Sequence, residues 1–155
     1  TLQGPMQAIR SFSAFIHYTD WVPAHIHMGT MGWVSMVSFA SIYFLVPRIY
    51  GKELYSIPLA NLHFWLVLTG QLVWSISLWI AGVLQAGMWN AMNPDGSLTY
   101  TFMETMVEMY PYWWARTIGG SLFMLGMLVF IYNLFKTVRN GEKTAPLAAT
   151  AEGRA

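Results

Sequence analysis

The chain lacks cysteine altogether and carries few charged residues. Without cysteine it has no disulfide framework, no thiolate metal site, no cysteine nucleophile and no thioether attachment for a haem. Charged residues make up 10% of its 155 residues, against about 25% in a typical globular chain. A soluble fold would lack polar side chains to cover its surface. The formal net charge of +1 provides no basic patch, so we expect no nucleic-acid partner.

Long hydrophobic runs take the place of the missing charges. Hydrophobic residues make up 55% of the chain, and residues 21–47, 54–94 and 117–135 contain no Asp, Glu, Lys or Arg. Each run is at least as long as the about 18–20 residues that cross a bilayer as a helix. The alternating pattern of a membrane β-barrel is absent from the sequence. The sequence therefore predicts an all-α, polytopic membrane helix bundle with three transmembrane helices.

Prolines and polar clusters set the predicted boundaries. Pro23 suits the first turn of the first span, and Pro47 marks its predicted end. Ser56 is the candidate cap of a second helix that starts near Pro58. The complete prediction is an outer-face loop or the end of a preceding helix at 1–20, transmembrane helices at 21–47, 58–86 and 112–135, a cytoplasmic connection at 48–57, a periplasmic loop at 87–111 that includes a short surface helix at 101–110, and a cytoplasmic tail at 136–155.

Basic residues are shared unevenly between the two ends of these spans. Up to Lys143, five lie on one side and two on the other, and the positive-inside bias places the richer side in the cytoplasm. The 48–57 connection and the C-terminus are therefore predicted to be cytoplasmic. The five are Arg48, Lys52, Lys136, Arg139 and Lys143, and the two are Arg10 and Arg116.

Two histidines, His25 and His27, stand inside the first apolar span, where imidazoles are costly without partners. At about 100° per residue, positions i and i+2 point to opposite faces of a helix, so the two rings are not expected to share one metal ion. A single neutral imidazole suits haem iron, because the porphyrin supplies the other nitrogens. A membrane histidine also serves as a hydrogen-bonding residue between helices, and the residues alone leave both interpretations open.

The neighbourhood of these histidines offers partners for haem propionates. His25 lies five residues after Asp20, which places it about 7–8 Å below the outer interface at the helical rise. The propionates of a haem at that depth would reach the polar layer. His17 and Arg116 are the candidate propionate partners, and arginine pairs with carboxylates through two parallel hydrogen bonds.

Longer motifs surround the histidine pair, and they occur at residues 18–33, 45–51, 61–65, 87–89, 93–100 and 116–120. This ordered series resembles the C-terminal portion of the catalytic subunit of haem–copper oxidases, in its cbb3-type form. The resemblance implies a twelve-helix subunit of which this chain supplies three helices. It also implies a bacterial inner-membrane enzyme that reduces dioxygen to water with electrons from cytochrome c and pumps protons. The implied partners are the remainder of the subunit and membrane-anchored c-type cytochrome subunits.

The resemblance also assigns the cofactors. It implies two b-type haems, with His25 as the axial ligand of the high-spin haem and His27 as an axial ligand of the low-spin haem. The copper ion would be bound by parts of the subunit outside this chain, because only His17 and His63 remain. We expect His63 to be structural, with a hydrogen bond at the end of its helix. The alternatives are a nitric oxide reductase catalytic subunit, a non-enzymatic membrane b-type cytochrome and a haem-free structural membrane protein.

Overall fold

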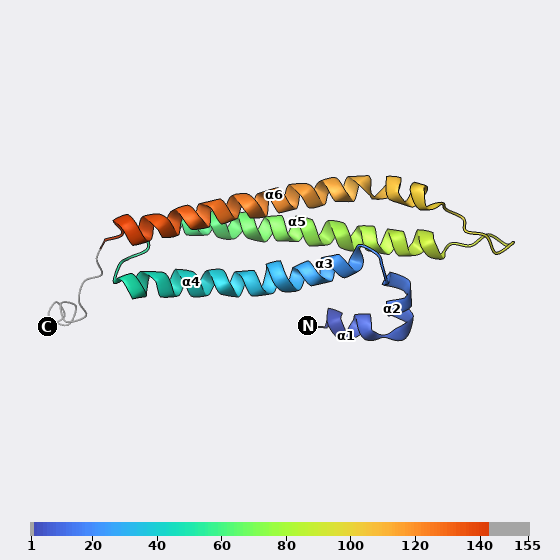
Figure 1. Ribbon diagram of the computed structural model, residues 1–155, viewed down its shortest axis with the longest axis horizontal. Helices are drawn as coiled ribbons and strands as arrows, with labels where there is room; N and C mark the ends of the chain where they lie inside the picture. The colour runs from blue at the N-terminus through green and yellow to red at the C-terminus, as the bar shows by residue number, and fades with distance from the viewer. Residues whose placement is uncertain (1, 143–155) are drawn as a thin grey trace.

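The computed structural model describes residues 2–142, which form a bundle of three long helices (Figure 1). In the first, α3 (Trp21–His27), η1 (Met28–Val34) and α4 (Ser35–Tyr50) follow one another without a break. The second and third are α5 (Ile57–Asn90) and α6 (Phe102–Asn140). All three are long and apolar enough to cross a membrane. The described residues contain no β-strand, so the structure confirms the all-α membrane bundle.

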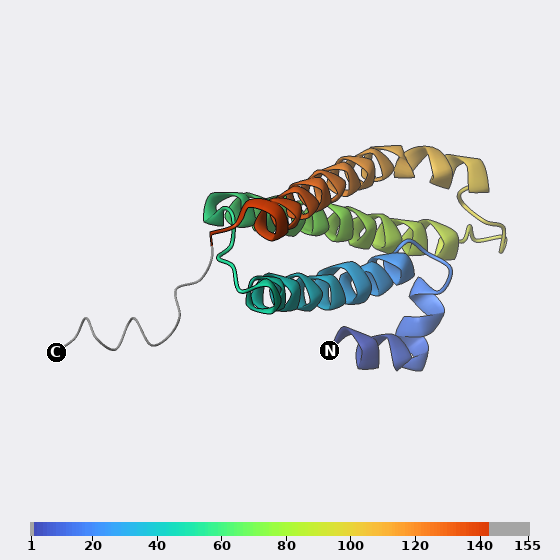
Figure 2. The same ribbon diagram turned by 60° about the vertical axis from the view of Figure 1, so that its left-hand side comes forward.

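The three long helices lie side by side, and α5 runs antiparallel to the other two (Figures 1 and 2). The contact between α5 and α6 is the most extensive between any two helices, and the contact between α4 and α6 is much smaller. Two short helices, α1 (Gln3–Ala8) and α2 (Arg10–Ile16), precede the bundle and fold back beside α3. This return places the beginning of the chain against the helix that carries both candidate ligands.

Glycines allow α5 and α6 to approach closely. A Cβ atom on Gly119 would lie 2.7 Å from the carbonyl oxygen of Gly70, and one on Gly70 would lie 2.7 Å from the carbonyl oxygen of Gly119. Closer to the C-terminal end of α5, a Cβ atom on Gly82 would overlap the backbone of Trp21. Small residues at such crossings let helix backbones pack in a membrane, and here they fix α3 and α6 against the two sides of α5.

His63 lies in the aromatic core between α4, α5 and α6. Its ring centroid is 4.8 Å from that of Phe39, 5.6 Å from that of Tyr43 and 4.9 Å from that of Phe130. The side chain is 2% exposed, and its Nε2 has no hydrogen-bond partner among the described residues. The predicted helix-end hydrogen bond of His63 is therefore not found among the described residues, because His63 lies six residues after the first residue of α5 and faces the aromatic core.

Two prolines lie inside helices that the sequence predicted to end or begin there. The first span continues through Pro47 to Tyr50 and ends at Gly51, whose φ of 58° is left-handed. Pro111 likewise lies inside α6, which begins at Phe102. A proline removes one backbone donor, and neighbouring helices in a membrane protein compensate for that loss. The predicted helix ends at Pro47 and Pro111 are therefore corrected.

The other predicted boundaries shift for related reasons. Ser56 caps α5 as predicted, because its hydroxyl accepts from the backbone N–H of Leu59 at 3.3 Å. Thr101 and Glu104 form a reciprocal capping box that starts α6. The predicted loop at 87–111 is thus shortened to 91–101, and the predicted surface helix is the first part of α6. The segment predicted as a loop or helix end at 1–20 contains the two short helices α1 and α2. The first residues of the predicted tail, 136–140, belong to α6, and the tail beyond 142 lies outside the described residues.

Candidate cofactor site

His27 stands at the end of α3, with its imidazole fixed on one side by its own helix. Its Nδ1 lies 2.7 Å from the carbonyl oxygen of Pro23. Because a carbonyl can only accept, Nδ1 carries the proton and Nε2 keeps its lone pair. The ring also lies against Trp74 of α5, with 5.1 Å between the ring centroids. The geometry leaves Nε2 as the nitrogen that can bind a metal.

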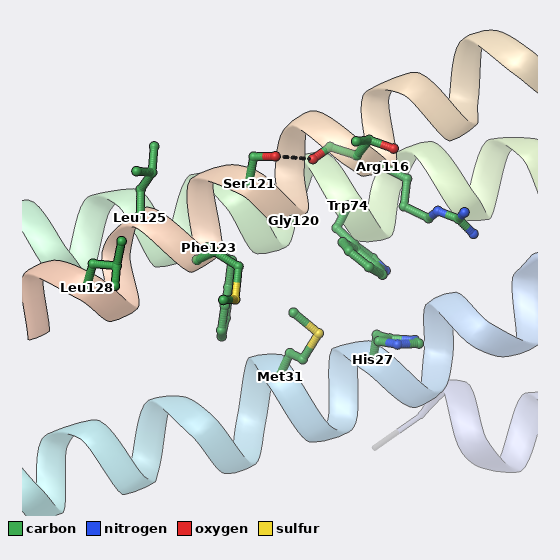
Figure 3. A pocket seen from close by; sticks show the side chains of 11 residues that line it. His27, Met31, Trp74, Arg116, Gly120, Ser121, Phe123, Leu125 and Leu128 are labelled. Carbon is green, nitrogen blue, oxygen red and sulfur yellow. Dashed lines mark hydrogen bonds between the residues drawn. The ribbon is translucent and has the colours of Figure 1, made fainter. Parts of the chain in front are cut away.

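A groove opens beside His27, between the first long helix and α6 (Figure 3), with a volume of about 910 Å³. This lies within the about 300–1,000 Å³ of sites for small molecules and cofactors. Met31, Trp74 and several apolar residues of α6 line it, and Arg116 is its cation. The Arg116 guanidinium lies 6.0 Å from the Trp74 ring centroid. The groove therefore suits a large apolar ring that carries a carboxylate.

A second polar group in this groove also fits such a ligand. The indole N–H of Trp74 is buried and has no hydrogen-bond partner among the described residues. Buried donors are normally paired, so one that is left over beside a cation suggests a missing acceptor. Gly120 of α6 adds to the fit, because a Cβ atom there would lie 2.6 Å from the Trp74 ring. The residues present therefore fit a haem whose propionate lies near Arg116.

His25 lines a different groove, of about 430 Å³, together with Gln3 of α1 and Met28, Gly29 and Trp33 of η1. Its Nδ1 lies 3.0 Å from Oε1 of Gln3. An amide oxygen can only accept, so Nδ1 again carries the proton and Nε2 is free to bind a metal. No atom would crowd a Cβ on Gly29 within 4 Å, so the wall beside His25 is open to a flat ligand.

The two candidate ligands therefore lie on different sides of one helix. None of the described residues lines both grooves. Between them stands Ile26, which is 53% exposed. The geometry is the one expected for residues i and i+2, and the assignment of each histidine to a haem iron stays a prediction.

Asp20 fastens the start of the histidine-bearing helix to the other two. Its backbone N–H donates to Oε1 of Gln85 at 2.6 Å. Its carboxylate oxygen Oδ2 accepts from the indole N–H of Trp113 at 2.8 Å and from Nε2 of Gln85 at 3.3 Å. Hydrogen bonds to a charged acceptor are stronger than neutral ones. One side chain thus joins α3, α5 and α6 just before the two histidines.

The structure separates the two candidate propionate partners. Arg116 lines the His27 groove, as described above. His17 is exposed and lines another hollow, with Arg10, Ser13, Ala14 and Tyr18, and its ring centroid lies 4.2 Å from that of Tyr18. The chain by itself does not bring His17 into either histidine groove, because α2 ends before the turn that leads into α3.

Three residues at the site were missed by sequence reasoning. Trp74 is one of many aromatic residues in an apolar run, so the sequence does not single it out. The adjacent small residues Gly119 and Gly120 indicate a close helix contact, and the structure shows that this contact is with Trp74. Gln3 precedes the first span and reaches His25 because α1 folds back. Gln71 is a polar residue in the middle of an apolar span, which is itself a signal of function in a membrane.

Within residues 2–142, no three side chains of His, Cys, Asp or Glu gather into a set that could hold a metal ion. The candidate ligands of this chain are therefore single imidazoles. A single imidazole is sufficient where a macrocycle supplies the remaining ligands of the metal.

Comparison with known proteins gives the class of this chain. Residues 1–122 match the family described as cytochrome C and quinol oxidase polypeptide I. A cbb3-type cytochrome c oxidase subunit CcoN1 from Stutzerimonas stutzeri is 45% identical over 98% of this chain. A cytochrome c oxidase subunit 1 homolog from Bradyrhizobium diazoefficiens is 43% identical over 92% of it. A nitric oxide reductase subunit from Stutzerimonas stutzeri is 26% identical over 84% of this chain and is covered over 28% of its own length.

The chain belongs to the cytochrome c and quinol oxidase polypeptide I family, and the resemblance to its cbb3-type members is confirmed. The alignments cover 32% of the length of the Stutzerimonas oxidase subunit and 26% of that of the Bradyrhizobium homolog. The chain thus spans about a third or less of the length of these curated relatives.

Proposed function

We propose that this chain is the C-terminal, haem-bearing part of the catalytic subunit of a respiratory terminal oxidase. The complete enzyme would reduce dioxygen to water with electrons from cytochrome c and couple that reaction to proton pumping. The remainder of the catalytic subunit would bind the copper ion, and membrane-anchored c-type cytochrome subunits would deliver the electrons. The bundle would span a bacterial inner membrane, with the 51–56 connection and the C-terminus in the cytoplasm.

The observation that carries the proposal is the pair of separate grooves on one helix. In each groove an imidazole has its Nδ1 engaged by an acceptor that belongs to the chain, Pro23 for His27 and Gln3 for His25. Such outer contacts fix the tautomer and the ring plane of a metal-bound histidine. We assign His25 to the high-spin haem, where oxygen would bind, and His27 to the low-spin haem.

The two b-type haems would supply the electron storage and oxygen chemistry. The residues of this chain bind, orient and shield them. Trp74 would hold the plane of the His27 imidazole, and Arg116 would compensate the charge of a propionate. The apolar side chains of α6 would give the bound ring a nonpolar wall on that side. The backbone from His25 to His27 would then give a short, rigid separation between the two haems.

The alternatives have less support. The nitric oxide reductase subunit is a more distant relative than the oxidase subunits, at 26% against 45% identity. A cytochrome that holds one haem between this pair would need both imidazoles in one cavity, and His25 and His27 line different grooves. A haem-free structural role leaves unexplained the buried indole N–H of Trp74, which has no partner among the described residues.

Separate histidine variants in the membrane complex that contains this chain test the proposal. We expect His27→Ala to abolish the low-spin haem signal in optical and electron paramagnetic resonance spectra. We expect His25→Ala to spare that signal and to remove carbon monoxide binding at the high-spin haem. Ile26→Ala is the matched control, because Ile26 stands between the two histidines and is exposed, and it should retain both signals. Equal loss of both species in each histidine variant, with the complex still assembled, would contradict the separate roles.

A further inference from the structure

The helix that carries the histidines changes its geometry directly after His27. Residues Met28–Val34 form η1, a π-helix, between two α-helical segments. π-Helical turns close i→i+5 hydrogen bonds, are rare, and occur frequently at functional sites. The wider turn holds one extra residue, so its conversion to α-helix would change the phase between α3 and α4 by about 100°. His27 and the core residues of α4 could then not both keep their present directions.

Gln71 of α5 reaches this turn from the side. Its Nε2 donates to the carbonyl oxygen of His27 at 3.3 Å and to Oγ of Ser75 at 2.7 Å. Its Cγ atom would lie 3.7 Å from a Cβ on Gly32, so the side chain packs against η1. Gln71 is 2% exposed and Ser75 is fully buried. Burying an amide in a membrane span costs free energy, which hydrogen bonds must offset. One of the hydrogen bonds of this amide goes to the backbone of His27, the candidate ligand.

We propose that Gln71 is a positioning residue for the low-spin haem, acting through the carbonyl of His27. This inference rests on the proposed role of His27 as a haem ligand. Gln71 holds the first turn of η1 open, and Ser75 holds the Gln71 amide in place. Together with the Pro23 carbonyl and the Trp74 ring, this contact sets the plane in which the His27 imidazole meets the iron. His25 lines the other groove, so the high-spin haem is not under the same control.

The test replaces the amide by a side chain of similar length that cannot donate. In Gln71→Met, we expect the g-values of the low-spin haem to shift and its resonance to broaden, because the imidazole plane is less fixed. Carbon monoxide binding by the high-spin haem should stay unchanged. Ser75→Ala, which deletes only the hydroxyl that anchors the amide, should shift the low-spin signal in the same direction by a smaller amount. Thr69→Val is the control on α5, since its hydroxyl bonds within its own helix.

The outcomes separate this inference from the function on which it rests. Low-spin g-values that stay at the wild-type position in both Gln71→Met and Ser75→Ala would overturn the positioning role. So would a change of equal size at both haems, which would indicate general loosening of the bundle. If instead His27→Ala retained the low-spin signal, the ligand assignment itself would fail, whatever the Gln71 variants did.

Discussion

The contact between Gly70 and Gly119 supports a quantitative prediction about stability. A Cβ atom on residue 119 would lie 2.7 Å from the Gly70 carbonyl oxygen and 2.7 Å from the backbone nitrogen of Trp74, whereas ordinary contact begins at 3.4 Å. Both obstacles are backbone atoms, which no rotamer change can move. In Gly119→Ala the two helices must separate by about 0.7 Å at this point, and such overpacking costs about 2 kcal/mol.

A loss of about 2 kcal/mol corresponds to about a 30-fold change in the unfolding equilibrium, because each 1.4 kcal/mol is a factor of ten. It can be measured by titrating the detergent-solubilised complex with dodecyl sulfate and following tryptophan fluorescence. Gly87→Ala is the matched control on α5, because no atom lies within 4 Å of a Cβ there. It should cost nothing, since alanine favours helix over glycine by up to about 1 kcal/mol. Equal stability of the two variants would refute the argument from close packing.

Three further predictions follow from polar contacts outside that interface. Asp20→Ala should lower the free energy of unfolding by about 2 kcal/mol in the same titration, because Trp113 and Gln85 lose a charged acceptor. An unchanged free energy of unfolding would show that these two hydrogen bonds do not stabilise the bundle. Gln3→Leu should lower the iron–histidine stretching frequency of the high-spin haem in resonance Raman spectra, because the His25 imidazole loses its acceptor; an unchanged frequency would exclude this role for Gln3. Hydrogen bonds from the side chain and backbone of Ser97 hold the pKa of Asp95 below its usual value. The order that they give the 91–101 loop should be complete above the usual pKa and be lost as the pH falls through the lowered one. Hydrogen exchange can follow this loss, and Ser97→Ala should weaken the effect without removing it, because the backbone N–H of residue 97 still donates to Asp95; an unchanged pH dependence would exclude a role for the hydroxyl.

The membrane bundle could be predicted because composition alone requires it. A charge-free run of the length of residues 21–47 has few alternatives to a membrane helix, whatever its tertiary partners. The opposite orientations of His25 and His27 could also be predicted, because helix geometry alone sets the angle between residues i and i+2 without any tertiary contact. The cap at Ser56 is local in the same sense.

The remaining features depend on contacts between distant parts of the chain. Pro47 and Pro111 have strong local tendencies to end a helix, but packing in the bundle outweighs them. Gln3 meets His25 across 22 residues, and Gln71 meets His27 across 44. No local sequence pattern predicts such pairs. The π-helical turn could not be predicted either, because its residues are almost all apolar and show no alternation of polar and apolar residues from which the helical period could be read.

The two histidine grooves share no lining residue among the described ones, so two cofactors bound there as proposed would be separately adjustable. A substitution of Trp74 or Arg116 reaches only the His27 side, and one of Gln3 or Gly29 reaches only the His25 side. If each groove holds a haem as proposed, substitutions could change the redox potential of one haem while the ligand affinity of the other stayed constant. The turn of helix that carries both histidines would then be the shortest path for electrons between the two proposed haems. It would also separate the two sets of lining residues, so that each set could change independently in evolution.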